Sequence, residues 1–315
     1  MKITLVGPGL SPIPPTGWGA VEILVWEMNL SYQKLGHDVQ IVNTTDLNDA
    51  LKEINLFNPD FVHIQYDDYI VLYPHLKFPT AITTHYGYLG RPQLIGGYWQ
   101  KLAYFPMIQP NIFALSQEIA TFYSNLGIPK EKIFVTPNGV NAENFKITDC
   151  PEHSDKSLYL AKVVDRKRQY MFQDISSLYY AGNIEDGRFD TTKNYLGEWD
   201  KKDLYNNLTH FANLVLLSDG EAHALVCMEA LSAGLGLVIS EWASANLDTN
   251  KEFITVIPED KINNINFIDE KIRENREVSL KNRKNIVEYS KQFYWDITLQ
   301  KYHLPFMEKI IRGQK

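Results

Sequence analysis

The stretch SDGEAHALVCMEALSAGLG, residues 218–236, determines how the second half of the chain is interpreted. Its central part, ALVCMEALSA, is apolar almost throughout, so it predicts a buried helix that begins near Ala224. Glu229 nevertheless lies near the centre of the apolar arc that forms when residues are placed at about 100° intervals. Because an unpaired buried charge is costly, we expect a partner that hydrogen-bonds to Glu229.

The segment before this helix indicates a ligand site. LVLLS predicts a strand and DGEAH the turn after its carboxyl end, where parallel α/β sheets bind ligands. The first free N–H groups of the helix would form an anion site. They belong to His223, Ala224 and Leu225. Glu229 lies about five residues further along, roughly 7.5 Å at 1.5 Å per residue, which is close to the distance from a diphosphate to its ribose.

Two carboxylates flank this predicted anion site. A carboxylate accepts hydrogen bonds and vicinal ribose hydroxyls donate them, so Glu229 is a candidate ribose ligand. Glu221, on the other side of the phosphates, could bind the hydroxyls of a transferred sugar in the same way. The alternative is a Glu229 satisfied by backbone groups or by a lysine, with Glu221 in solvent.

Basic residues follow the first predicted strand of the second half. LYLAKVVDRKRQY places Lys162 at the end of that strand, and Arg166, Lys167 and Arg168 at the start of a predicted helix. The ammonium groups of Lys162 and Lys167, together with a helix N-terminus, could neutralise a nucleoside diphosphate leaving group without a metal. For Arg166 and Arg168 the pattern favours a solvated basic face.

Composition limits the classes of protein that fit. The 315 residues carry a net charge of −7 and neither half is basic, which argues against nucleic acid as the main partner. Cys150 and Cys227 have neither zinc-site spacing nor a disulfide framework. The sequence shows no signal-peptide core and no run of about 18 apolar residues, so we expect a cytoplasmic protein that is at most peripheral at a membrane.

Short apolar runs alternate with helical patterns along the chain, which favours α/β domains with doubly wound parallel sheets. The runs are KITLV, VQIV, DFVHIQ, TAITT, NIFALS and KIFVTP in the first half, and SLYLA, SLYYAG, LVLLS, LGLVIS and FITVIP in the second. A polar, turn-rich stretch at 137–157 separates the two series. We expect domains at 1–145 and 146–296, and a helical segment at 297–315 that packs back on the first domain.

Seven short motifs resemble, in order, those of one enzyme family. They are PPTGWGAVE, LGHDVQIV, NPDFVHIQ, TTHYG, EKIFVTPNGVNAENF, LAKVVDRKRQ and EAHALVCME, the last with two glutamates separated by seven residues. Over nearly its whole length the chain resembles the retaining glycosyltransferases of glycosyltransferase family four. The resemblance implies the GT-B fold, in which two Rossmann-like domains face each other across a cleft.

The resemblance also implies roles for residues of the second domain. Glu221 would contact the sugar of a nucleotide diphosphate donor, and Glu229 its ribose. Lys162 and Lys167 would hold the diphosphate. Lys162 replaces a more usual arginine, which keeps the charge but loses bidentate geometry.

Two residues of the first domain would complete the site. Gly19 would lie in a loop that closes over the reaction centre, and His85 would lie beside the donor sugar, so that His85, Glu221 and Lys167 form the implied catalytic set. Ala20 and Ala161 stand where the family commonly has glycine, which restricts backbone approach to a ligand.

The implied activity is metal-independent transfer of a sugar from a nucleotide sugar to an acceptor hydroxyl in glycan or glycoconjugate synthesis, with retained configuration and no further cofactor. The acceptor could be a glycan, a lipid or a small molecule. Two other readings stay open: a sugar-nucleotide epimerase of the same fold, and an inactive partner subunit. The aromatic-rich stretch GYLGRPQLIGGYWQKLAYFPM could line an acceptor site, face a membrane or belong to the core.

Two further motifs are weaker. GPGLSP follows the first strand like a dinucleotide fingerprint, but Pro12 takes the place of its third glycine. The aspartates of YDDY, Asp67 and Asp68, could form a metal-binding pair, although the pattern favours a loop.

Overall fold

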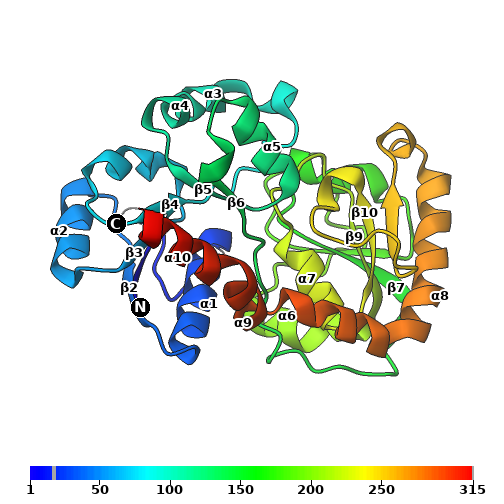
Figure 1. Ribbon diagram of the computed structural model, residues 1–315. Coiled ribbons are helices and arrows are strands. Elements are labelled where there is room, and N and C mark those ends of the chain that lie inside the picture. Colours follow the sequence, from blue (N-terminus) through cyan, green and yellow to red (C-terminus); the bar gives the residue numbers. More distant parts are fainter. Residues whose placement is uncertain (16–18, 314–315) are drawn as a thin grey trace. The chain divides into compact units, whose positions relative to one another are not determined.

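The computed structural model describes residues 1–15 and 19–313 and comprises two compact units (Figure 1). The first unit contains Met1–Gly139 and Trp295–Lys315, and the second contains Val140–Tyr294. The chain thus leaves the first unit after residue 139 and returns at residue 295, where the sequence had suggested divisions after 145 and 296. Each helix in the described part of the chain is too short or too polar to span a bilayer.

The first unit is built on a six-stranded sheet in which all neighbouring strands are parallel, in the order β2-β1-β3-β4-β5-β6. The strands are β1 (Lys2–Val6), β2 (Asp38–Val42), β3 (Phe61–Ile64), β4 (Thr80–Ile82), β5 (Asn111–Ala114) and β6 (Ile133–Val135). Each coincides with or lies within one of the six predicted runs, except that β2 begins one residue before VQIV. The order reverses at β1, as in doubly wound sheets.

The helices of this unit begin and end where the sequence provides capping residues. Helix α1 (Ala20–Lys34) ends before Gly36, whose φ of 84° is left-handed and terminates the helix as predicted. The side chains of Asp46 and Ser116 cap α2 (Leu47–Phe57) and α5 (Gln117–Asn125). Shorter elements are η1 (Asp67–His75), η2 (Pro92–Leu94), η3 (Gly96–Tyr98), α3 (Trp99–Leu102), α4 (Tyr104–Ile108) and η4 (Lys130–Lys132).

The C-terminal segment is part of the first unit. Helices α9 (Trp295–Thr298) and α10 (Leu304–Gly313) flank a π-helical turn at Leu299–His303. The Trp295 indole donates to Glu27 of α1 with an Nε1–Oε2 distance of 3.0 Å. A Cβ added to Gly139 would lie 2.5 Å from the Trp295 ring, so only glycine fits there.

The second unit has a five-stranded parallel sheet in the order β11-β10-β9-β7-β8. The strands are β7 (His153–Leu160), β8 (Leu178–Ala181), β9 (Phe211–Leu216), β10 (Gly236–Ser240) and β11 (Ile254–Ile257). Each strand overlaps one of the five predicted runs, and β7 and β9 begin before theirs. Two doubly wound parallel sheets therefore confirm the expected α/β class.

Helices cover the second sheet. They are α6 (Lys201–Asn207), α7 (Leu225–Ser232) and the long α8 (Ile265–Ser290), with single turns η5 (Asp165–Lys167), η6 (Gln169–Phe172), η7 (Leu208–His210), η8 (Glu241–Ala243), η9 (Glu259–Lys261) and η10 (Lys291–Phe293). Helix α8, orange in Figure 1, packs on β9 and β10. Its buried Ser279 hydroxyl donates to Ala212 at 2.5 Å and accepts from the Gly236 N–H at 2.7 Å, which ties the amino ends of both strands.

One predicted helix does not form. The sequence predicted a helix after Lys162, but the chain forms the two 3₁₀ turns η5 and η6 there. Arg168, between them, has a φ of 57° in the left-handed region, which no α-helix accommodates. This break changes where the three neighbouring basic side chains point.

Candidate functional site

The candidate site of the second unit lies where the carboxyl ends of β7 and β9 meet. These strands are neighbours, with Leu158 in register with Leu214. The hydroxyl of Tyr159 in β7 accepts from the Leu217 N–H at 2.8 Å and donates to the carbonyl of Lys167. Burial raises the pKa of Tyr159, so the phenol keeps its proton. Tyr159 thereby joins the loops that follow both strands.

Glu221, in the loop after β9, lies in a cluster of opposite charge. Its Oε1 contacts Lys167 Nζ and lies 3.1 Å from Arg166 Nη1. The side chains of Glu221 and Lys167 are only 9% and 12% exposed, so solvent screens this pair weakly. Arg166 also donates to the Gly220 carbonyl. The expectation of a solvated Arg166 is therefore wrong, because its guanidinium is used within the cluster.

The charged groups of this cluster shift one another's pKa values. Burial alone would raise the pKa of Glu221, but the positive charges of Lys167 and Arg166 outweigh it and hold that pKa below its usual range. Burial lowers the pKa of Lys167, and the Glu221 carboxylate opposes that effect. The carboxylate is thus anionic at neutral pH and held between two cations.

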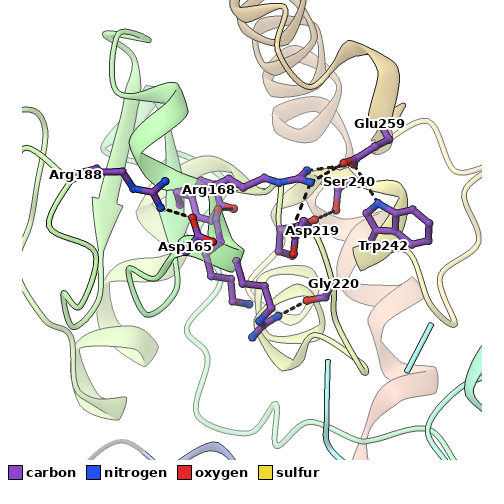
Figure 2. Close-up of polar contacts among 12 residues, drawn as sticks. Asp165, Arg168, Arg188, Asp219, Gly220, Ser240, Trp242 and Glu259 are labelled. Carbon is purple, nitrogen blue, oxygen red and sulfur yellow. Dashed lines mark hydrogen bonds and ion pairs between the residues drawn. The ribbon is translucent and has the colours of Figure 1, made fainter. Parts of the chain in front are cut away.

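Arg168 pairs with other carboxylates than the one in this cluster (Figure 2). Its guanidinium makes two hydrogen bonds to Glu259, Nη1–Oε2 at 3.1 Å and Nη2–Oε1 at 2.6 Å, and lies 3.7 Å from Asp219. Trp242 Nε1 also donates to Glu259, at 3.1 Å. The side chain of Arg168 is 12% exposed, so the expected solvated basic face is wrong for this residue too.

Lys162, the second lysine expected at the diphosphate, follows β7 and contacts another partner. Its Nζ lies 2.5 Å from Glu185 Oε1, and its side chain is 51% exposed. The Lys162 carbonyl accepts from Gln169 Nε2 at 3.0 Å, which fixes the backbone beside it. The structure therefore brings together Glu221 and Lys167, while Lys162 lies at the solvent-exposed side of the same loop.

Helix α7 begins beside the cluster. It starts at Leu225 after Ala224, which offers no side chain to cap the first N–H groups. Burial lowers the pKa of the preceding His223 to about 4, so its imidazole is neutral at physiological pH. The three predicted anion-site residues thus form the amino end of a real helix, with uncharged side chains around it.

The partner expected for Glu229 is Lys201. Glu229 lies on α7 with its side chain 9% exposed, and its Oε1 contacts Lys201 Nζ. Lys201 is the first residue of α6, which Asp200 and Asp203 begin with a capping box. The lysine partner is one of the alternatives that the sequence left open. The ribose role of Glu229 stays a prediction.

The other two predicted site residues belong to the first unit. His85 follows β4, and its Nε2 lies 2.9 Å from Gln65 Oε1. Burial lowers the pKa of His85 to about 4, so this ring is neutral as well. Gly19 precedes α1, and a Cβ there would lie 2.5 Å from the Glu22 carboxylate. The remainder of the expected closing loop, residues 16–18, lies outside the described residues.

The YDDY motif forms a 3₁₀ helix instead of the expected loop. Asp67 is buried, and this burial raises its pKa to about 7, whereas Asp68 pairs with Lys101. In residues 1–15 and 19–313, no three His, Cys, Asp or Glu side chains gather as metal ligands.

Three residues at this site were not found by sequence reasoning. Lys201 and Glu259 contact the site from segments far away along the chain, and Arg166 takes part through the unexpected turn η5. The sequence DKKD does predict the start of a helix at Lys201, but a local pattern gives no sign of the partner on α7.

Comparisons with known proteins agree with this architecture. Residues 42–144, about a third of the chain, match the model of Glycosyltransferase Family 4. A search of curated protein sequences found no match. The structure of HepE from Anabaena in complex with UDP-glucose is similar over 99% of this chain and 100% of that one, with a TM-score of 0.75 and 13% identity.

Two further solved structures have the same fold. Sucrose-phosphate synthase from Thermosynechococcus elongatus is similar over 100% of both chains, with a TM-score of 0.75 and 15% identity. AviGT4, a glycosyltransferase involved in avilamycin A biosynthesis, is similar over 99% of this chain and 98% of that one, with a TM-score of 0.72 and 15% identity. The likeness to these structures shows that the chain has the GT-B fold. Over residues 42–144, the family match agrees with the resemblance to glycosyltransferase family four that the motifs indicated.

Proposed function

We propose that this protein is a retaining glycosyltransferase that moves a sugar from a nucleotide diphosphate donor to an acceptor hydroxyl, without a metal. The observation that carries the proposal is the cluster of Glu221, Lys167 and Arg166 beside the amino end of α7, in which the Glu221 and Lys167 side chains are only 9% and 12% exposed. It supplies an acceptor for sugar hydroxyls and a positive environment for phosphate within one site.

Lys167 can serve the leaving group while it stays paired with Glu221. An ammonium group has three N–H donors, so one can hold Glu221 and another a phosphate oxygen. Negative charge on the diphosphate grows as the glycosidic bond breaks, and a cation fixed in a poorly hydrated site stabilises that charge more strongly than water does. The uncapped N–H groups at the start of α7 would add to this effect.

Glu221 and Glu229 would bind the two hydroxyl-bearing parts of the donor. A carboxylate has about four acceptor positions, so Glu229 can keep its contact with Lys201 and accept from the vicinal hydroxyls of ribose. The anionic Glu221 would accept from hydroxyls of the transferred sugar. On the first unit, His85 is neutral and can donate to or accept from a sugar hydroxyl without charge.

The acceptor would bind to the first unit, and we assign no protein nucleophile. Catalysis would consist of stabilising the leaving diphosphate and orienting an oxocarbenium-like sugar toward the acceptor. Synthesis of a glycan or glycoconjugate by a cytoplasmic protein fits this donor chemistry.

A screen of nucleotide sugars by thermal unfolding tests the proposal, beginning with UDP-glucose. A true donor at 100 times its Kd stabilises the folded protein by about 2.7 kcal/mol. The matched variant Glu229→Gln should lose much of this stabilisation, while Lys193→Ala, which removes an exposed ion pair with Asp174, should keep it.

The products of the selected donor then define the reaction. A retaining transferase gives a glycoside with the anomeric configuration of the donor, which nuclear magnetic resonance reads directly. Conversion of the nucleotide sugar itself without acceptor would identify an epimerase instead. Binding without any turnover over a panel of sugar and lipid acceptors would favour an inactive partner subunit.

A further inference from the structure

Arg168 has a backbone conformation that is unusual for a residue with a side chain. It ends the turn η5 with φ 57° and ψ 18°, in the left-handed region, where a Cβ is crowded by the backbone. The preceding residue is Lys167, which contacts Glu221. Such conformations persist where surrounding contacts hold them, and they gather at functional sites.

The contacts that hold Arg168 come from two other loops (Figure 2). Its guanidinium and the Glu259 carboxylate form a bidentate pair with distances of 2.6 and 3.1 Å, and Trp242 fixes the same carboxylate by a hydrogen bond of 3.1 Å. We call Arg168, Glu259 and Trp242 the Arg168 clamp. A planar bidentate pair specifies direction as well as distance, so it can fix the backbone that carries it.

The Arg168 clamp joins parts of the sheet that are not neighbours. Arg168 follows β7, whereas Glu259 lies in η9 after the edge strand β11 and Trp242 lies in η8 after β10. The order β11-β10-β9-β7 means that the clamp reaches across the carboxyl end of β9, where the Glu221 loop begins. Asp219 of that loop lies 3.7 Å from the Arg168 guanidinium.

We propose that Glu259 and Trp242, acting through Arg168, are positioning residues that hold Lys167 against Glu221. The clamp holds the left-handed backbone conformation of Arg168 at the end of η5. That conformation directs the Lys167 side chain to Glu221 and the Arg168 side chain to Glu259. The catalytic consequence rests on the proposed function of Lys167 at the diphosphate; the structural consequence does not.

The variant Arg168→Gly distinguishes two possible roles of Arg168, holding the backbone of the turn and supplying a positive charge. Glycine adopts the left-handed region freely, so Arg168→Gly removes the clamp but keeps the conformation accessible. Arg168→Ala removes the clamp and keeps the unfavourable Cβ. If the clamp acts through the backbone, Arg168→Ala should lose at least tenfold in turnover with little change in the donor KM, and Arg168→Gly should retain most of it.

Hydrogen–deuterium exchange gives a readout that does not depend on activity. Arg168→Ala and Glu259→Gln should exchange faster than wild type in residues 163–171 and 219–224, and Glu259→Gln should add nothing in the Arg168→Gly background. Arg188→Ala is the matched control. Arg188 contacts Asp165 of the same turn and lies 3.7 Å from the centre of the Tyr170 ring, with its side chain 48% exposed. Its loss should raise exchange less than Arg168→Ala does and should leave turnover unchanged.

Several results would overturn the proposal. They are equal turnover losses for Arg168→Ala and Arg168→Gly, turnover of Arg168→Ala within twofold of wild type, unchanged exchange in both segments, and an equal effect of Arg188→Ala. If Arg168→Ala does not fold, the near-isosteric Glu259→Gln decides by its exchange rates and its turnover. A wild type that binds and turns over no nucleotide sugar refutes the proposed function alone, and the exchange rates then decide the clamp.

Discussion

Glu229→Gln removes one charge from the buried contact with Lys201 and replaces one carboxylate oxygen with an amide nitrogen. The Glu229 side chain is 9% exposed and that of Lys201 is 26% exposed, so water partly compensates the lysine that remains. We therefore expect the free energy of unfolding to fall by about 1–3 kcal/mol, below the 3–5 kcal/mol typical of a fully buried pair.

The same substitution should weaken binding of the nucleotide by about 1–3 kcal/mol, because an acceptor for the ribose hydroxyls is lost. This corresponds to a roughly 5- to 150-fold rise in Kd. Calorimetric titration with UDP and with its 2′,3′-dideoxy analogue measures it. Wild type should prefer UDP, and Glu229→Gln should bind both ligands with similar affinity.

Lys201→Met is the control, since it disrupts the same pair from the other side and leaves the carboxylate in place. It should lower stability but keep a preference for the ribose hydroxyls. The reasoning is refuted if Glu229→Gln weakens the dideoxy analogue as much as UDP. Unchanged affinity together with a large loss of stability would mean that Glu229 is purely structural.

Three further predictions follow from the site and its surroundings. Lys167→Ala should lower turnover by about 10²-fold or more with a smaller effect on the donor KM. Arg166→Ala should lower turnover by a comparable factor, because both cations contact Glu221. Steady-state kinetics measures both effects, and a loss of turnover below twofold in Arg166→Ala would contradict the prediction. Burial raises the pKa of Asp67 from 3.8 to about 7, so the folded state holds a proton that the unfolded state releases, and the free energy of unfolding should fall as pH rises from about 4 to about 7. Asp67→Asn should abolish that dependence and stabilise the protein at pH 8 by about 2–4 kcal/mol in denaturant titrations, whereas a destabilised variant would mean that the carboxylate is needed in its charged form. Activity should survive exhaustive EDTA treatment, and restoration of a lost activity by Mg²⁺ or Mn²⁺ would refute the metal-independent mechanism.

The strands and α7 could be predicted because their signal is local. Strands buried on both faces, such as β3 and β10, are nearly continuous apolar runs, and α7 is apolar almost all round. The turn DGEAH and the carboxylates on either side of it then follow from the position of the helix start. Glu221 and Lys167 were placed together by the order of the family motifs, and they do meet.

The parts that sequence reasoning missed depend on contacts between distant segments. Arg168 prefers a right-handed conformation, and its left-handed backbone goes with a carboxylate 91 residues away, at Glu259. Lys201, the partner of Glu229, lies 28 residues earlier on α6, and the local sequence of α6 predicts only where that helix begins. Propensity and periodicity describe a segment by itself, so they carry no information about such partners.

The most direct test of the proposed donor site is a crystal structure with UDP bound. We predict diphosphate oxygens within hydrogen-bond distance of Lys167 Nζ and of the N–H groups at residues 223–225, and ribose hydroxyls on the Glu229 carboxylate. Diphosphate bound elsewhere on the second unit, or a ribose that leaves Glu229 in contact with Lys201 alone, would contradict the account.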